Sequence, residues 1–157
     1  MIQRIQTVYY AISAICLIIV SFGMTLFLFV SEKHQIIFSA YGLEKLDQQG
    51  QLVEVQSGWL FLSSVALALL CIMAILSYKN LDRQMKLGRL TLLIYILILI
   101  AMIAAFYMGN RITGEEITDK KLGIGFILFA VGFPFIFMGN LGVKRDKKLL
   151  DSLDRLR

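Results

Sequence analysis

The side chains that could act as nucleophiles or metal ligands are few in this sequence and lie far apart. The two cysteines, Cys16 and Cys71, do not form a Cys-x-x-Cys pair, which is the pattern of thiol–disulfide enzymes. His34 is the single histidine, so a zinc site with a second histidine ligand is not predicted. We expect both cysteines to be small, buried, protonated side chains and His34 to be a solvated residue.

Acidic residues cluster only around Glu115, Glu116 and Asp119. A calcium site needs 6–8 oxygen ligands and often a glycine turn. Lys120 and Lys121 follow these acids directly, which favours a solvated turn. The sequence therefore predicts no catalytic residue, no metal site and no bound cofactor.

The composition places the chain in a membrane. Of its 157 residues, 58% are hydrophobic and 17% are charged, compared with about 45–50% and about 25% in soluble domains. Four uncharged stretches each exceed the roughly 18 apolar residues of a spanning helix. This composition excludes a soluble enzyme, a disordered tail and a nucleic-acid-binding domain. Because no Asp, Glu, Lys, Arg or His lies within the expected spans, an ion-coupled transporter is also disfavoured.

The pattern predicts an all-α membrane protein with one domain over residues 1–157, a four-transmembrane-helix bundle. The expected spans are residues 7–30, 58–78, 90–109 and 122–143. The expected connections are outer loops 31–57 and 110–121 and an inner link 79–89, followed by a tail 144–157.

Two connecting segments carry structure of their own in this prediction. Within the first outer loop, residues 36–43 are rich in β-forming residues, and 51–56 alternate apolar and polar side chains. The polar residues 47–50 separate them, so we expect a small outer hairpin. Leucines at helical spacing in the tail predict an amphipathic helix that continues from the last span or bends away from it.

The positive charges indicate the orientation. Of the 16 Lys and Arg residues, 11 lie in segments 1–6, 79–89 and 144–157, and five lie in the two outer loops. By the positive-inside rule, both termini are predicted to be cytoplasmic. The same distribution argues against nucleic acid as a partner, because the basic residues flank the spans.

Small residues recur at intervals that place them on one helix face. In the last span the interval is seven residues, and in the third span it is four. Such stripes allow close helix packing, either within the bundle or against another membrane protein. A proline in the last span is expected to kink the helix. The residues concerned are Gly125, Gly132, Gly139 and Pro134 in the last span, and Ala101, Ala105 and Gly109 in the third.

Four segments together resemble one protein family: MIQRIQTVYY at the start, YKNLDRQMKLGRL in the inner link, the final span, and VKRDKKLLDSLDRLR at the end. They are similar to four-helix inner-membrane proteins of Bacteroidota that are known only as a domain of unknown function. The resemblance covers the whole chain and implies a bacterial inner-membrane setting, without an activity. In the tail, Lys147 stands where the family has an acidic residue.

Three of the resembling segments map to the predicted cytoplasmic face. They suggest a polar network that ties both termini to the inner link. Its expected members are Arg4, Lys79, Arg83, Asp151, Asp154 and Arg155.

The function expected from these observations is that of a non-enzymatic integral membrane protein, a scaffold or accessory subunit of a larger inner-membrane assembly. The alternative is a protein that handles a lipid or apolar ligand, held between helices near Pro134 with the outer hairpin as a lid. An enzyme of the quinone or thiol type is the third reading. The expected partners are the lipid bilayer, another membrane protein or a second copy, and anionic lipid headgroups.

Overall fold

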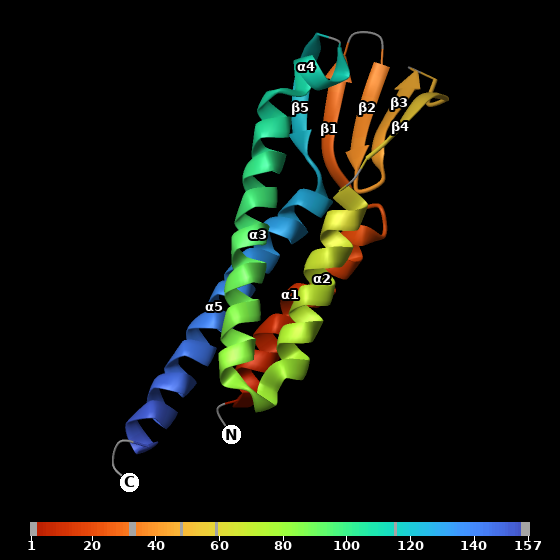
Figure 1. Ribbon diagram of the computed structural model, residues 1–157. Coiled ribbons are helices and arrows are strands. Elements are labelled where there is room, and N and C mark those ends of the chain that lie inside the picture. Colours follow the sequence, from red (N-terminus) through yellow and green to blue (C-terminus); the bar gives the residue numbers. More distant parts are fainter. Residues whose placement is uncertain (1–2, 32–33, 48, 59, 115, 155–157) are drawn as a thin grey trace.

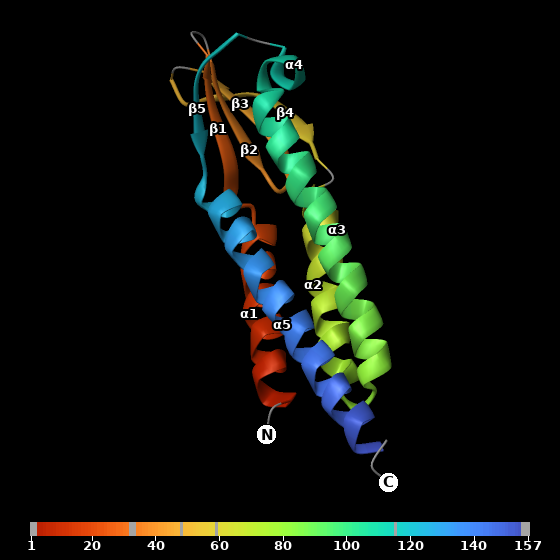
Figure 2. The same ribbon diagram turned by 90° about the vertical axis from the view of Figure 1, so that its left-hand side faces the viewer.

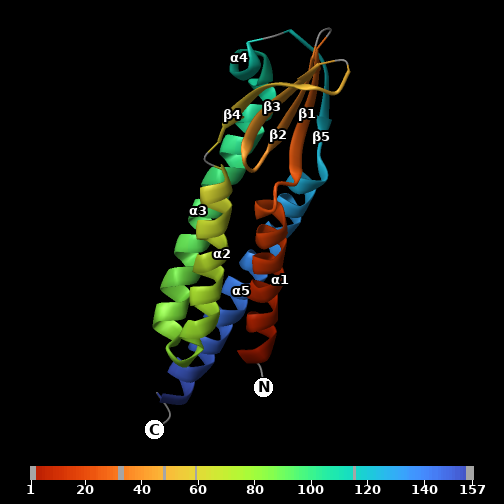
Figure 3. The same ribbon diagram turned by 90° about the vertical axis from the view of Figure 1, so that its right-hand side faces the viewer.

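The computed structural model describes residues 3–31, 34–47, 49–58, 60–114 and 116–154. A bundle of helices carries a β-sheet at one end, here called the sheet end (Figure 1). Both chain ends lie at the opposite end, here called the terminal end (Figure 3). The helices are α1 (Gln3–Ser21), α2 (Leu60–Leu76), the short 3-10 helix η1 (Ser77–Lys79), α3 (Leu81–Tyr107), α4 (Gly109–Thr113) and α5 (Ile124–Asp154).

The predicted all-α four-helix bundle is wrong, because the fold contains a five-stranded antiparallel sheet and is α/β. The strand order is β4-β3-β2-β1-β5. The strands are β1 (Thr25–Ser31), β2 (His34–Ser39), β3 (Gly42–Asp47), β4 (Leu52–Ser57) and β5 (Ile117–Leu122).

The first predicted span, 7–30, divides into a helix and a strand. Helix α1 ends at Ser21, and Gly23 follows with φ +85°, the left-handed conformation that commonly terminates helices. After Met24, the seven residues TLFLFVS (25–31) are rich in aromatic and β-branched side chains and form β1. Because 7–30 is apolar throughout, its hydrophobic pattern does not separate a helix from a buried strand.

The turn predicted at residues 47–50 is present and joins β3 to β4. The amide of Asp47 donates to the carbonyl of Gln51 at 2.9 Å, and the amide of Gly50 donates to the carbonyl of Asp47 at 2.8 Å. The segment 36–43 is not one strand, since a turn at Ala40 and Tyr41 separates β2 from β3. The expected hairpin is thus one part of a larger sheet.

The other connections are more ordered than predicted. The expected loop 110–121 contains most of α4 and all but the last residue of β5, which pairs with β1 through Phe29 and Lys120. The expected link 79–89 is mostly helix, because Asn80 caps α3 and its side chain accepts the amide of Arg83 at 3.1 Å. The expected tail helix is a direct continuation of α5, which runs without interruption through Pro134.

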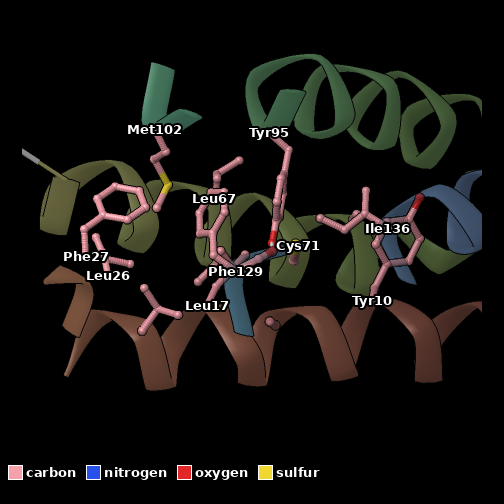
Figure 4. Packing of buried hydrophobic residues seen from close by; sticks show 14 of the residues in the cluster. Tyr10, Leu17, Leu26, Phe27, Leu67, Cys71, Tyr95, Met102, Phe129 and Ile136 are labelled. Atoms are coloured by element: carbon pink, nitrogen blue, oxygen red, sulfur yellow. Dashed lines mark hydrogen bonds between the residues drawn. The ribbon is translucent and has the colours of Figure 1, made fainter. Parts of the chain in front are cut away.

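Helix α3 joins the two layers of the molecule. It is longer than α2 and continues beside the sheet (Figure 2). The ring of Phe106 lies 5.2 Å from that of Phe27 and 6.0 Å from that of Phe29, both on β1. One face of the sheet is therefore buried against α3, and it joins a core that extends down the bundle (Figure 4).

Three helical segments are long and apolar enough to cross a membrane: Leu60–Lys79, Leu81–Tyr107 and Ile124–Ser152. The first predicted span contains a shorter helix, since the apolar helix Ile5–Ser21 falls below the 18-residue length. It packs beside the others against α2 and α5. Only 17–28% of the residues in the three apolar windows are buried inside the protein. The large outward-facing apolar surface is compatible with a lipid environment.

Replacing Gly42 by Ala is expected to destabilise the protein more than replacing Gly50 by Ala. Both glycines have positive φ, but a Cβ on Gly42 would lie 2.0 Å from the carbonyl oxygen of Gln56, whereas one on Gly50 meets nothing within 4 Å. We expect Gly50→Ala to cost about 1–2 kcal/mol, as for one residue forced into the left-handed region. Gly42→Ala should cost about 3 kcal/mol or more, because backbone must also move. Thermal unfolding in detergent measures the melting temperature of each variant. Equal decreases for Gly42→Ala and Gly50→Ala would contradict the assigned β3–β4 packing.

Candidate functional site

The most extensive contact between helices is the antiparallel seam of α1 and α5. The α1–α5 seam is defined here by Gln6, Tyr10 and Ser13 on α1 and by Gly132, Gly139 and Asp146 on α5. All six residues are buried. Polar side chains are therefore buried along the seam, although the outer surface of the bundle is apolar.

In the middle of the seam, Gly139 makes room for the ring of Tyr10. A Cβ on Gly139 would lie 3.0–3.2 Å from three ring carbons of Tyr10. The Tyr10 hydroxyl donates to Oδ1 of Asn140 at 3.1 Å, and Nδ2 of Asn140 donates to the carbonyl of Gly88 at 2.8 Å. This chain of hydrogen bonds connects α1, α5 and α3. Since a Cβ on Gly88 would lie 2.1 Å from Oδ1 of Asn140, the connection requires glycine there.

Closer to the sheet, Gly132 makes room for the hydroxyl of Tyr95. Tyr95 projects from α3 into the bundle (Figure 4) and donates to the carbonyl oxygen of Phe129 at 2.6 Å. Pro134 lies in the same stretch of α5 and has no amide hydrogen to donate to the carbonyl four residues earlier, on Ala130. Tyr95 thus supplies a hydrogen bond to the α5 backbone beside the position where the helix loses one of its own.

At the terminal end of the seam, the side-chain amide of Gln6 donates to the carboxylate of Asp146. Gln6 is 3% exposed and Asp146 is 8% exposed, so the pair is buried. The sequence pattern placed Asp146 in the predicted tail 144–157 and did not predict this contact. The signal was present, because Asp146 follows Gly139 by seven residues and continues the helix face marked by the glycines.

The remaining small residues of the last span and α4 contact the sheet. Gly125 lies against β1, since a Cβ there would be 2.8 Å from the carbonyl oxygen of Thr25. Gly109 begins α4 and is close to the side chains of Phe29 and Ile117. In the described structure both glycines are buried between elements of the chain itself.

The alanines predicted on the same stripe as Gly109 lie elsewhere. Ala101 is exposed and Ala105 is half-buried on α3. Helix α3 ends at Tyr107, so Gly109 does not continue their helix face. Pro134 is exposed on the outside of α5, and the interior at its level is filled by Tyr95 and Phe129.

Half of the predicted polar network can be located. The side chains of Arg4 and Asp154, and all of Arg155, lie outside the described residues. Lys79, Arg83 and Asp151 are exposed side chains. Lys79 ends η1, Arg83 lies in the first turn of α3 and Asp151 lies near the end of α5. Figure 1 shows the start of α3 at the same end of the bundle as the end of α5.

A different ion pair joins these segments, between Lys147 on α5 and Asp82 on α3. Both residues lie beyond the uncharged stretches of their helices. The hydrogen bond and charge of Lys147 lower the pKa of the Asp82 carboxyl, and the hydrogen bond from Lys147 to Asp82 raises the pKa of the ammonium group. Because both side chains are solvent-accessible, the pair orients the end of α5 more than it stabilises the fold.

The sheet presents its second face away from α3. Side chains alternate between faces along a strand, and Phe27 and Phe29 point to α3, so Leu28 between them points outward. Across the sheet Leu28 is aligned with Ile37, Glu44 and Val55. Lys121 of β5 is also aligned with Leu28, so this outer face mixes apolar and charged side chains. The views of Figures 2 and 3 show no helix over it.

The two edge strands of the sheet differ. Strand β4 is exposed at every residue, with exposed fractions of 64% for Leu52, 59% for Val53 and 64% for Val55. Strand β5, the other edge, carries Asp119 and Lys121 as well as Lys120. Charged side chains on an edge strand discourage pairing with another chain, whereas an apolar, exposed edge invites it.

A model of the family described as "Domain of unknown function (DUF4293)" matches residues 2–156. The chain belongs to this family. The match covers the α1–α5 seam, the whole sheet and both edge strands. The comparison with curated proteins finds no match. The family description assigns no activity.

The Gln6–Asp146 pair can be tested by a double-mutant cycle. Gln6→Leu leaves a buried carboxylate without its amide partner and should lower the free energy of unfolding by about 1–3 kcal/mol. Gln6→Leu combined with Asp146→Leu should recover most of this loss, because replacing both partners by apolar groups is nearly neutral. Thermal unfolding of the wild type, both single variants and the double variant gives the coupling. Additive effects of the two substitutions would show that the pair does not form.

Proposed function

We propose that this protein is a non-enzymatic membrane-anchored scaffold or accessory subunit that binds another protein by strand addition at β4. The observation that carries the proposal is the exposed, apolar edge of β4, with Leu52, Val53 and Val55 unburied. In strand addition, an extended segment of a partner pairs with a free sheet edge, and main-chain hydrogen bonds supply the affinity.

The contrast between the two edges supports this role. On β5, Lys120 donates to the carbonyl oxygens of Phe106 and Tyr107 at 3.3 and 3.2 Å, which fixes this edge against the end of α3. On β4 the single charged residue, Glu54, is paired with Lys45 at 3.2 Å. The charge of Glu54 is therefore used in an ion pair within its own sheet. Strand β4 lacks the charged side chains that, on β5, oppose pairing with another chain.

In this proposal the helix bundle anchors the protein in the membrane. Its interior is packed with side chains such as Leu17, Leu67 and Ile136, each fully buried. Its outside is apolar over three long helices. By the distribution of Lys and Arg, the terminal end lies on the cytoplasmic side of the membrane and the sheet on the opposite side.

Val53→Lys with Val55→Lys should abolish the partner complex while leaving the bundle folded. Both side chains are exposed on β4, and charges on an edge strand oppose added strands. The measurement is native mass spectrometry of the protein released gently from its own membranes. Gln49→Lys with Gln51→Lys is the matched control, because it adds the same charge at exposed positions of the adjacent turn.

A stoichiometric second protein, present in the wild type and the control and lost in the β4 variant, would support the proposal. A complex of two copies of the chain that is lost in the β4 variant would instead assign this edge to self-association. A partner retained by the β4 variant, or a bare monomer in every sample, would contradict the proposal.

A further inference from the structure

A groove runs along the outside of the bundle between α3 and α5. Its volume is about 380 Å³, and it is lined mainly by apolar side chains. Leu92, Leu93, Ile96 and Phe137 form its apolar wall, and Arg89 and Lys144 are its two charged residues. Because α3 and α5 belong to the three segments that are apolar enough to span a membrane, the groove faces the lipid phase if the bundle is embedded.

The two charged residues lie together at one end of the groove. Helices α3 and α5 are antiparallel, and the hydrogen bond from Asn140 to the carbonyl of Gly88 fixes their alignment. Arg89 follows Gly88 directly, and Lys144 lies one helical turn beyond Asn140 toward the terminal end. Leu93 and Ile96 lie one and two turns from Arg89 in the opposite direction, toward the sheet. The groove is thus basic at the terminal end and apolar toward the middle of the bundle.

Neighbouring acids do not neutralise this end of the groove. Asp82 is bound by Lys147, and Asp146 accepts from Gln6 on the other side of α5. A second groove, between α1 and α5, provides an internal comparison. Its volume is about 450 Å³, and it is lined by both Arg145 and Asp146, so its charges balance. Only the α3–α5 groove, of these two, combines an apolar wall with uncompensated positive charge.

We propose that the α3–α5 groove binds one anionic phospholipid, with the headgroup phosphate between Arg89 and Lys144 and an acyl chain along Leu92, Leu93 and Ile96. The arginine fork and the lysine ammonium both donate to phosphate oxygens. The apolar wall receives the chain at the depth at which a lipid already lies. The site is independent of strand addition at β4, since the groove and the sheet share no residue.

The test compares lipid binding by the full-length protein in a mild non-ionic detergent. Native mass spectrometry is used with phosphatidylglycerol and with phosphatidylcholine of the same acyl chains. The wild type should retain one phosphatidylglycerol in preference to phosphatidylcholine. Arg89→Gln with Lys144→Gln should lower phosphatidylglycerol affinity about tenfold or more, since basic residues near the surface attract anionic headgroups, and should abolish the preference.

Two further variants separate a defined site from general surface charge. Arg83→Gln with Lys148→Gln removes the same charge from exposed positions that do not line the groove, and it should keep the preference. Ile96→Trp fills the apolar wall from its exposed side and should reduce binding of both lipids while the melting temperature is retained.

The proposal is overturned if the Arg89 and Lys144 variant keeps its preference for phosphatidylglycerol. It is also overturned if the Arg83 and Lys148 variant loses the preference to the same degree, because the charge would then act without a site. If Ile96→Trp leaves binding of both lipids unchanged, the acyl chain does not occupy the groove. A result on β4 partner binding has no bearing on any of these outcomes.

Discussion

The close approach of α1 to α5 is the contact on which the rest of the structure depends. Glycines on one face of α5 allow this close approach. On that face Gly139 contacts the ring of Tyr10, and Gly125, nearer the sheet end, contacts the backbone of β1. Gly123, between β5 and α5, donates its amide to the carbonyl of Leu26 at 2.8 Å. Strand β1 follows α1 and strand β5 precedes α5, so packing of the two helices brings these strands together in register. The sheet is therefore an extension of the helix packing.

Polar side chains give this packing its specificity. Between apolar helices in lipid, hydrophobic burial does not favour one alignment over another, and directional hydrogen bonds do. Tyr10, Asn140 and the carbonyl of Gly88 connect three helices at one level. Near the sheet, the hydroxyls of Ser21 and Ser64 are 2.8 Å apart and connect α1 to α2. Each of these contacts is satisfied only in one register of the helices.

The sequence predicted three of the long apolar helices and the turn at 47–50, but it extended the first helix over β1 and did not predict the sheet. The segment 25–31 is as apolar as the helix before it, so local pattern does not show where α1 ends. The segment 117–122, ITDKKL, is half charged and becomes a strand only because β1, far away in the chain, lies beside it. Asp146 was placed in the tail because charged residues were taken to end the span, although its spacing of seven from Gly139 places it on the same, buried face of α5. In each case the missing information was a contact between distant segments.

A single residue, Gly123, separates β5 from helix α5, which continues without a break for 31 residues. At about 1.5 Å per residue it is a rod of roughly 46 Å, which connects the sheet to the far end of the bundle. A load applied to the sheet would therefore pass along a single element through the full thickness of a bilayer. Helix α5 is weakest at Pro134, where one backbone hydrogen bond is missing. Near that position the hydroxyl of Tyr95 donates a hydrogen bond to the carbonyl oxygen of Phe129. The Tyr95 hydroxyl thus supports α5 from α3 at the level where the α5 backbone lacks one of its own hydrogen bonds.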